Sequence, residues 1–352
     1  MPFETVHLRV NGRKLPHTEC TLNCGAEEVE RDASFSVAWN GAGLPCETQE
    51  PATVHIGSEL WLTGEVRDIN PAHDAESRTY QINLISATCD ASECSVVHPT
   101  GLVKNADMMA VAKAFDTLGI GVEGDVQTEI KRVHKLRQGE TLIDTLETEA
   151  SNQGVLIHDT PEGKLKLADK PEGRHAGTLK RGVNIKSATG ALSSAGSFSE
   201  VTGKGQNSHG TNSTSMRPTA TVKNAGVKRR RPLIKIYEGE TTEPKLKKRV
   251  EWENKRTEGN NTSATLVTPG WRDAAGKVWD RNFLVSVDDD WIAIEQDMVT
   301  ATVSLHQGDD GTYASLGVKD PPALGGKNAK GKSAKSWAAP GEAQADYREE
   351  EA

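Results

Sequence analysis

The sequence predicts an α+β fold that is mostly β, with two small antiparallel β-barrel-like domains and an α/β domain between them. Short alternating segments separated by Gly, Asn and Asp recur through the first 95 residues. After residue 96 the apolar residues change to the spacing of a helix. The chain contains 33 glycines and only 5% aromatic residues, which is typical of turn-rich β structure. Its length of 352 residues predicts two or three domains.

Residues 1–95 are expected to form the first β-barrel-like domain. Strands are predicted at 5–10, 33–39, 53–56, 59–66 and 78–87. The first of these runs into Asn11-Gly12, a strong signal for a type I′ hairpin turn. The loop 70–74 contains side chains that could bind a ligand. Because the same residue types are ordinary turn formers, a solvated connection is the preferred interpretation.

All five cysteines lie in this first domain: Cys20, Cys24, Cys46, Cys89 and Cys94. An odd number of cysteines in a protein made in the cytoplasm disfavours disulfides. Two pairs, Cys20 with Cys24 and Cys89 with Cys94, leave a four-cysteine metal site open as an alternative. Structural zinc sites normally use closer Cys-x2-Cys pairs. We therefore predict free thiols and no metal or other cofactor.

Residues 96–185 are expected to form the α/β middle domain. Its first helix is predicted at 106–118 and is ended by Gly119, with an apolar face made by Met108, Val111, Ala112, Phe115 and Leu118. The second helix is predicted at 141–153, with Thr141 or Asp144 capping its first amides and Gly154 following it. Two short strands, 155–158 and 164–167, complete the domain.

Residues 186–320 are expected to form the second β-barrel-like domain. A Ser/Gly/Thr/Asn-rich stretch, 187–216, is interpreted as a mobile loop with one strand at 198–205. A polar helix is predicted at 243–258. Two basic clusters, 228–231 and 245–249, could bind nucleic acid. The glutamates around them favour a solvated, charge-balanced face instead.

The segment 270–292 contains three of the seven tryptophans and is predicted to form a hairpin. Gly276 suits the positive-φ position of its turn, and Trp271 and Trp279 are expected to hold the hairpin by packing. The acidic run 288–290 could hold a cation. Its place between a strand and Trp291 favours a connecting turn.

Residues 321–352 are expected to be a tail that is disordered when free, because Pro, Gly and charged residues dominate it. Trp337 and Tyr347 are isolated aromatic residues there. They are interpreted either as anchors for a partner or as plain tail residues.

The sequence contains no pattern of a catalytic nucleophile, a zinc protease or a phosphate-binding loop, so an enzyme is not predicted. The net charge of −8 argues against a protein that coats nucleic acid. It is compatible with the wall of a DNA conduit, since binding grows with every phosphate neutralised. No stretch is long and apolar enough to insert into a membrane, and no signal peptide is evident, so the chain is expected in the cytoplasm where it is made.

Several motifs in collinear order carry a resemblance to a known family. They are Gly270-Trp271, the turn ending at Gly276, then Trp279 and Asn282, preceded by Arg231-Pro232 and by the helix-then-hairpin segment 137–157. This series resembles the baseplate hub (tail protein P) of Mu-like contractile-tailed phages, over residues 103–321. The first hundred residues match the family only loosely.

The resemblance implies a homotrimer that joins the six-fold tail tube to the three-fold central spike in the virion baseplate. It also implies other baseplate proteins as partners, assembly in the host cytoplasm, and a channel through which phage DNA passes without specific binding. A related alternative is the hub-like part of a tailocin or a secretion spike. A second alternative is a LysM-like peptidoglycan-binding module, because residues 138–142 followed by a helix are similar to its opening. A LysM module would require a second helix, which the sequence does not predict.

Overall fold

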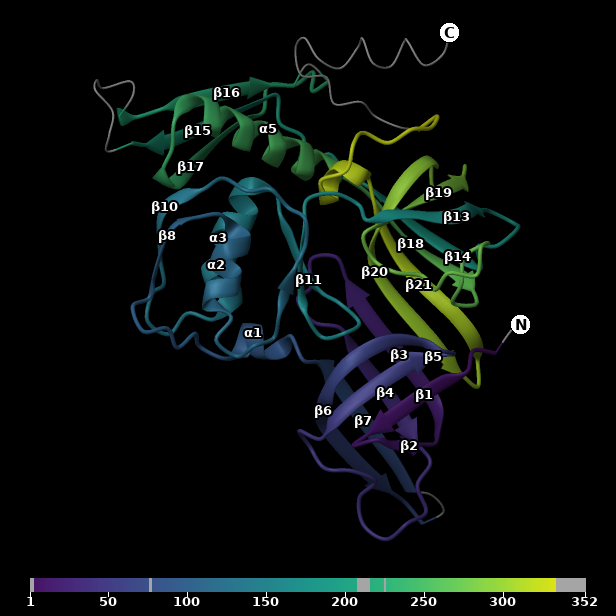
Figure 1. Ribbon diagram of the computed structural model, residues 1–352. Coiled ribbons are helices and arrows are strands. Elements are labelled where there is room, and N and C mark those ends of the chain that lie inside the picture. Colours follow the sequence, from purple (N-terminus) through teal and green to yellow (C-terminus); the bar gives the residue numbers. More distant parts are fainter. Residues whose placement is uncertain (1–2, 76–77, 208–215, 225, 334–352) are drawn as a thin grey trace.

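The computed structural model describes residues 3–75, 78–207, 216–224 and 226–333, and Figure 1 shows how they are arranged. A 13-stranded sheet runs through the molecule, accompanied by three smaller sheets and a few helices. The predicted class, α+β and mostly β, is confirmed.

Seven strands form the N-terminal part of the large sheet. They are β1 (Val6–Val10), β2 (Arg13–Leu15), β3 (His17–Gly25), β4 (Asp32–Val37), β5 (Pro51–Ile56), β6 (Glu59–His73) and β7 (Arg78–Ser86). Asn11 and Gly12 join β1 to β2 with φ values of 49° and 75°, the left-handed pair that a type I′ turn requires. Residues 70–73, expected as a loop, instead continue β6 and pair with β7.

The next segment contains three helices and five short strands. They are α1 (Cys89–Glu93), β8 (Leu102–Ala106), α2 (Met108–Phe115), β9 (Val122–Glu123), β10 (Lys131–Lys135), α3 (Leu142–Gln153), β11 (Leu156–Asp159) and β12 (Leu165–Ala168). Helix α3 begins with a capping box, in which the Thr141 hydroxyl accepts the Asp144 amide and the Asp144 carboxylate accepts the Thr141 amide. Gly154 ends the helix with φ of 73°.

Helix α2 is shorter than predicted. It ends at Phe115, and the Asp116 carboxylate accepts the amide N–H groups of Ile120 and Gly121 at 2.9 and 2.7 Å. This side-chain turn competes with the last helical turn. Leu118, expected on the buried face, is therefore 54% exposed, and Gly119 lies in the following loop.

Six strands form the C-terminal part of the large sheet. They are β13 (Gly173–Lys180), β14 (Ser187–Leu192), β18 (Thr262–Pro269), β19 (Phe283–Asp289), β20 (Ile294–Gly308) and β21 (Gly311–Lys319). Strands β3 and β20 pair antiparallel, with Leu22 opposite Leu305, and so join the two parts. Apolar side chains from both parts pack in one continuous core. The two β regions, predicted as separate barrels, thus share a sheet.

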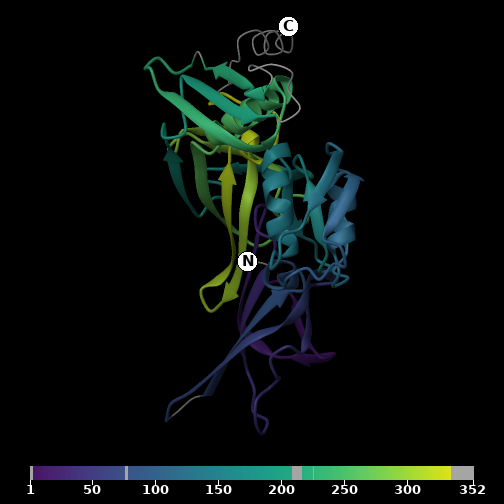
Figure 2. The ribbon, with the colours of Figure 1, turned by 90° about the vertical axis from the view of Figure 1, so that its left-hand side faces the viewer.

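The segment 200–259 differs from the expectation that it belongs to the second barrel. Strands β15 (Glu200–Gln206), β16 (Thr219–Lys223) and β17 (Pro232–Glu240) form a separate three-stranded sheet. Helix α5 (Glu243–Gly259) covers one face of it, where Leu246 and Val250 are fully buried in a small core of their own. Figures 1 and 2 place this layer beyond one end of the large sheet. The helix predicted at 243–258 is confirmed.

The stretch 187–216 contains two strands, β14 and β15, where one was expected in a mobile loop, and its residues 208–215 lie outside the described part. The expected disordered tail is wrong for its first part. Residues 321–324 form a 3₁₀ turn with Leu324 fully buried, and the Asp297 amide donates to the Lys330 carbonyl at 2.9 Å. Trp337 and Tyr347 lie outside the described residues. No helix in the described ranges is both long and apolar enough to span a membrane.

Candidate functional site

The turn at Trp271–Asn282 is held by its two tryptophans, as the packing interpretation requires. The side chain of Trp271 is fully buried, and its Nε1–H donates to the carbonyls of His306 and Tyr313, each at 3.0 Å. The Trp279 amide donates to the Trp271 carbonyl at 2.9 Å. Gly276 has φ of 84°, in the left-handed region predicted for it. The turn is thereby locked onto the hairpin of β20 and β21.

A buried His175–Asp273 pair fixes the same turn from the β13 side. The Asp273 carboxylate accepts the amides of Ala176, Ala275 and Lys277 at 2.9–3.0 Å and lies 3.1 Å from Nδ1 of His175. Nε2 of His175 accepts the Asp280 amide at 3.2 Å, so the proton of the neutral ring sits on Nδ1. Burial opposes ionisation of Asp273, but these hydrogen bonds hold its pKa below the usual range. The pair therefore orients the turn that precedes β19.

Three charged residues from distant parts of the chain meet in the interior. Nε of Arg31, which precedes β4, donates to Asp159 at the end of β11 at 2.7 Å. Arg281, in the turn before β19, donates to the other oxygen of Asp159 at 2.6 Å. None of the three side chains is more than 3% exposed. We call Arg31, Asp159 and Arg281 the charged junction, because it joins the N-terminal strands, the α/β segment and the C-terminal strands.

His158 and Glu172 extend the charged junction towards the surface. His158 is buried, and its Nε2 lies 3.1 Å from Glu172. Burial alone would raise the pKa of Glu172, but hydrogen bonds from His158 and Lys166 lower it to about 2. Sequence reasoning missed the junction because a buried arginine and a solvated one look alike in a turn-rich sequence. The polar residues beside Trp279 are the local sequence signal that points to the charged junction.

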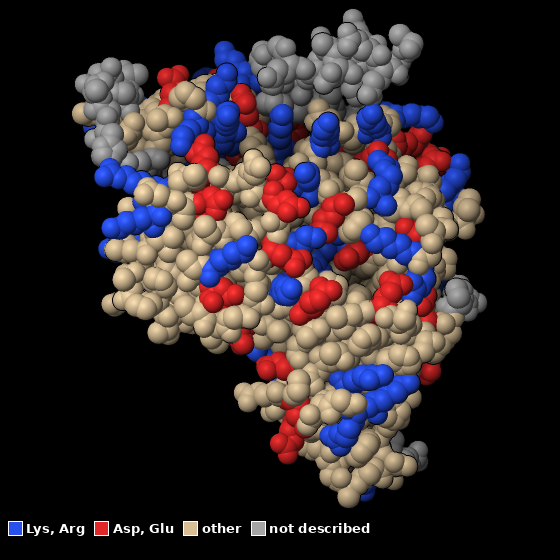
Figure 3. All heavy atoms as spheres, viewed as in Figure 1, with Lys and Arg blue, Asp and Glu red and all other residues tan. Residues whose placement is uncertain are grey.

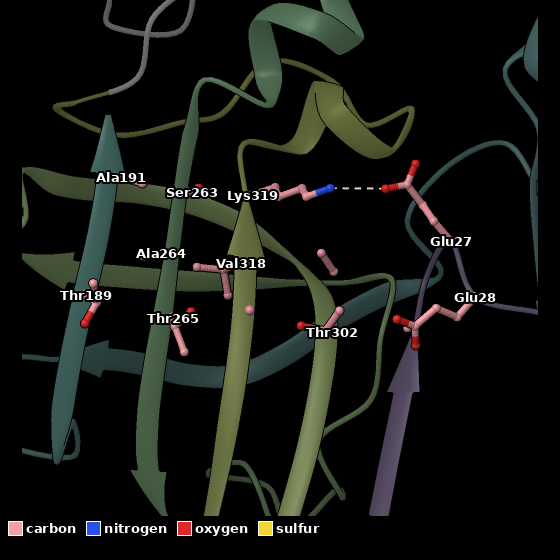
Figure 4. Close-up of a pocket in the computed structure, with 13 residues that line it drawn as sticks. Glu27, Glu28, Thr189, Ala191, Ser263, Ala264, Thr265, Thr302, Val318 and Lys319 are labelled. Carbon is pink, nitrogen blue, oxygen red and sulfur yellow. Dashed lines mark hydrogen bonds and ion pairs between the residues drawn. The ribbon is translucent and has the colours of Figure 1, made fainter. Parts of the chain in front are cut away.

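The open face of the large sheet is lined by small polar side chains. On β18, β20 and β3, buried residues alternate with outward residues such as Thr265, Thr302 and Asn23, and β14 adds the exposed Thr189. The pairing registers place these in rows across neighbouring strands. Figure 4 shows part of this face, where the strands enclose an open hollow of about 430 Å³.

One edge of the hollow carries charge. The Lys319 ammonium pairs with the Glu27 carboxylate at 3.1 Å (Figure 4). Glu28 stands nearby, and burial, followed by the repulsion of Asp32, raises its pKa. Apart from such edge groups, the hollow is lined by hydroxyls, methyl groups and backbone. Small side chains make this surface even, and the polar groups of the hollow do not converge as those of a small-molecule site do.

The clusters that could have bound a ligand have partners within the chain. Asp288 and Asp290 pair with Lys180 and Arg181 at 2.9 and 2.7 Å, and Asp289 accepts the Trp291 amide, as a connecting turn requires. Of the basic clusters, Arg230 lies 3.8 Å from Glu200 and Lys247 lies 3.9 Å from Glu251. Figure 3 shows both signs interspersed over the middle of one face, with Lys and Arg gathered along its upper part, near α5.

The structure does not assemble the four-cysteine alternative. In the part of the chain that is described, no three His, Cys, Asp or Glu side chains are grouped to hold a metal ion. All five thiols are free, and burial raises the pKa of Cys20 and Cys89 to about 12. A protonated thiol is a poor metal ligand.

The motif Arg231-Pro232 lies where β17 begins. The Arg231 guanidinium donates to the carbonyls of Ser194 and Ala195 at 2.6 and 3.1 Å, and its amide donates to the Ser199 hydroxyl at 2.7 Å. Arg231 thus ties β17 to the segment that leads into β15. Gly270, Trp271 and Asn282 lie elsewhere, in the connection between β18 and β19 of the large sheet. The residues of the family motif therefore stabilise two separate places in the fold.

The LysM alternative is not supported by the chain path after α3. Residues 155–168 form β11 and β12, a short antiparallel hairpin, where a LysM module would need a second helix.

Two family models match this chain. The second domain of "baseplate hub protein gp44-like" matches residues 88–169, and "Mu phage baseplate assembly protein GpP, fourth domain" matches residues 242–326. The chain is also 24% identical to the baseplate hub protein gp44 of Escherichia phage Mu, over 93% of this chain and 92% of that protein.

Solved structures resemble the whole chain. The 43 kDa tail protein of prophage MuSo2 from Shewanella oneidensis has a TM-score of 0.79 and 26% identity, over 92% of this chain and 99% of that one. The tail protein of Neisseria meningitidis MC58 has a TM-score of 0.76 at 19% identity, over 92% and 99% of the two chains. An E. coli component of the type VI secretion system has a TM-score of 0.58 at 8% identity, over 94% and 79%, which shows a shared fold alone. In its ordered motifs, in the residues matched by both family models and in its fold, the chain is thus similar to the baseplate hub proteins of Mu-like phages.

Proposed function

We propose that this protein is a baseplate hub that assembles as a homotrimeric ring and joins the six-fold tail tube to the three-fold central spike. The ring belongs to the virion, is assembled in the host cytoplasm and performs no chemical reaction. Its central channel lets phage DNA pass during ejection. The observation that carries this proposal is that eight strands of the large sheet divide into two halves with one strand order.

Eight strands form a continuous antiparallel path, in the order β14-β18-β21-β20-β3-β4-β7-β6. The path divides at the β20–β3 pair into two halves of four strands each. In both halves a hairpin, β20-β21 or β3-β4, lies next to the division. The two strands farther from the division are β18 and β14 in one half, and β7 and β6 in the other. In each of these pairs the strand that comes later in the chain lies next to the hairpin. The halves thus share one strand order, with the chain cut at different points. Three copies of two similar halves would present six similar surfaces, which supports a three-to-six adaptor.

The open face of the path supports the channel. Rows of Thr, Ser and Asn side chains, interspersed with Gly, offer few cations to a phosphate backbone. Since affinity for DNA rises with each phosphate that is neutralised, such a wall would let DNA slide without holding it. The net charge of −8 acts in the same direction.

The trimer is tested by the mass of the protein in solution. Sedimentation equilibrium at micromolar concentration should return three times the chain mass of 37.9 kDa, and negative-stain images should show a three-fold ring. A monomer mass at these concentrations would contradict the proposal.

The channel is tested separately by adding charge to the open face. The triple variant Thr189→Lys, Thr265→Lys, Thr302→Lys should remain trimeric and should bind duplex DNA at low salt, whereas the wild-type ring should not. Binding should weaken as salt rises, because counterions are released. The matched triple Ser variant should behave as the wild type. A lysine variant that forms rings but retains no DNA would show that this face does not line the channel.

A further inference from the structure

Three exposed apolar side chains gather on one flank of the molecule, where the large sheet ends at β14. They are Val183 in the β13–β14 turn, Leu192 at the end of β14, and Trp291 in the β19–β20 turn, with exposed fractions of 75%, 56% and 81%. Ile292 bridges them, since it lies directly over Gly190 in the middle of β14. We call these three residues the β14 flank. In Figure 1 the strand β14 lies on the side of the large sheet away from the α/β segment.

Trp291 is held rigidly although it is exposed. The buried Asp289 carboxylate accepts its amide at 3.0 Å, and the Arg181 guanidinium lies over its ring at 5.4 Å from the centroid. Ala293, two residues later, has φ of 57°, which is strained for a residue with a side chain. A strained turn that displays a fixed tryptophan to solvent is typical of a binding hot spot.

The charges of this flank are already paired within the chain. Arg181 pairs with Asp290 at 2.7 Å and Lys180 with Asp288 at 2.9 Å. The flank therefore has little net charge with which to attract nucleic acid or an anionic partner. What it offers is apolar area, the property of the centre of a stable protein–protein contact.

The flank also borders an unpaired strand edge. Among the described strands, β14 is hydrogen-bonded along one edge only, to β18. An exposed edge invites further strand pairing, so native proteins cover or blunt it. In a closed ring of identical chains each copy meets the next through two different surfaces, and the end of a sheet that curves around the ring is one of them.

From these observations we propose that the β14 flank is a subunit contact, and that its occupant is the next copy of this chain in the ring. The assignment rests on the proposed trimer. Trp291 inserts into the neighbouring copy, and Val183 and Leu192 pack around it and exclude water.

Two variants test the assignment against matched controls. Trp291→Ala should raise the dissociation constant of the trimer by about 30-fold, the loss expected for an aromatic hot spot. Val183→Asp should abolish the trimer, since it buries an unpaired charge. The controls are Leu44→Ala and Val97→Asp, which change apolar residues with exposed fractions of 52% and 82% away from this flank. Sedimentation velocity gives the constants, and circular dichroism should show unchanged folding of all four variants.

Fluorescence gives a second readout that does not depend on a weakened assembly. Quenching of tryptophan fluorescence by acrylamide is measured for the wild type and for Trp291→Phe. The difference between the two reports the accessibility of Trp291 alone. This difference should be large in the diluted monomer and should vanish in the trimer.

Each outcome decides the matter. A wild-type trimer that Trp291→Ala and Val183→Asp leave unchanged, or in which Trp291 stays quenchable, overturns the β14 flank while the trimer stands. The same follows if Val97→Asp dissociates the ring as strongly as Val183→Asp. A wild type that is monomeric at every concentration overturns both the flank and the proposed function.

Discussion

Trp271 is expected to contribute more to the stability of its turn than Trp279 does, although the two look equivalent in sequence. Both side chains are buried, but only Trp271 has acceptors for its Nε1–H, the carbonyls of His306 and Tyr313. Nε1 of Trp279 has no acceptor among the described residues. A hydrogen bond that is lost inside a protein leaves its partner unsatisfied, which costs about 1–3 kcal/mol.

We therefore expect Trp271→Phe to lower the free energy of unfolding by about 2 kcal/mol more than Trp279→Phe, measured by urea denaturation. Trp279→Ala should also destabilise, by about 3–5 kcal/mol, because it opens a cavity in the core. A Trp279→Ala protein with unchanged melting and normal trimers would refute the role of this residue in packing.

His175 should make stability depend on pH. Burial, the largest effect, lowers the pKa of His175 below its ordinary value of 6.5, against the hydrogen bond to Asp273 that raises it. On acidification the unfolded chain takes up this proton first, so the free energy of unfolding falls as the pH drops below about 6.5 and is fully present above it. Protonation would also displace the Asp280 amide from Nε2.

The expected result is that His175→Gln loses less stability than the wild type between about pH 7.5 and pH 5.5. Other histidines with lowered pKa values, such as His17 and His134, contribute equally to both proteins, so the difference isolates His175. Urea denaturation at several pH values measures it. Parallel curves for the two proteins would mean that His175 has the same pKa folded and unfolded.

At the scale of one element, α3 shows how local sequence signals work. Thr141→Ala removes the hydroxyl that accepts the Asp144 amide and should cost about 1 kcal/mol of stability. Thr141→Ser keeps the oxygen and should cost little. Hydrogen exchange of the first α3 amides should report the change directly, and equal protection in both variants would contradict the cap.

The other end of α3 shows what local signals miss. Gly154 was expected to follow the helix, and its φ of 73° confirms that role. A side chain there would also collide with the Trp252 ring of α5, at 2.4 Å from the added carbon. Glycine is thus needed twice, once for the turn and once for the close approach of a helix about a hundred residues away.

At the scale of the whole molecule, the charged junction couples the three parts of the chain. Asp159→Ala would leave the guanidinium groups of Arg31 and Arg281 buried without their shared carboxylate. Removing one member of a buried ion group typically costs about 3–5 kcal/mol. Since the parts would lose their link, unfolding should also separate into more than one transition.

Asp169→Ala is the matched control, because Asp169 is exposed and lies ten residues further along the same segment. Scanning calorimetry and urea denaturation measure both variants. If Asp159→Ala unfolds as one transition with the stability of Asp169→Ala, the junction does not couple the parts.

Local sequence patterns are enough to predict the class, the turns and the caps of this protein. Alternation decides which face of a strand is buried, Asn11-Gly12 and Gly276 suit left-handed turns, and Thr141 supplies a cap within four residues. The ordered motifs around Arg231 and Trp271 also carry the resemblance to the baseplate hub proteins.

Which elements meet is visible only in the folded chain. Alternation does not select a pairing partner, so nothing local joins Leu22 to Leu305 or separates 200–259 from the second β region. Likewise, the fold brings Arg31 and Arg281 together on the buried carboxylate of Asp159. It leaves Trp291 exposed to solvent. The physical reason is that burial and long-range pairing depend on the packing of distant segments, whereas turns and caps depend on the few residues that form them.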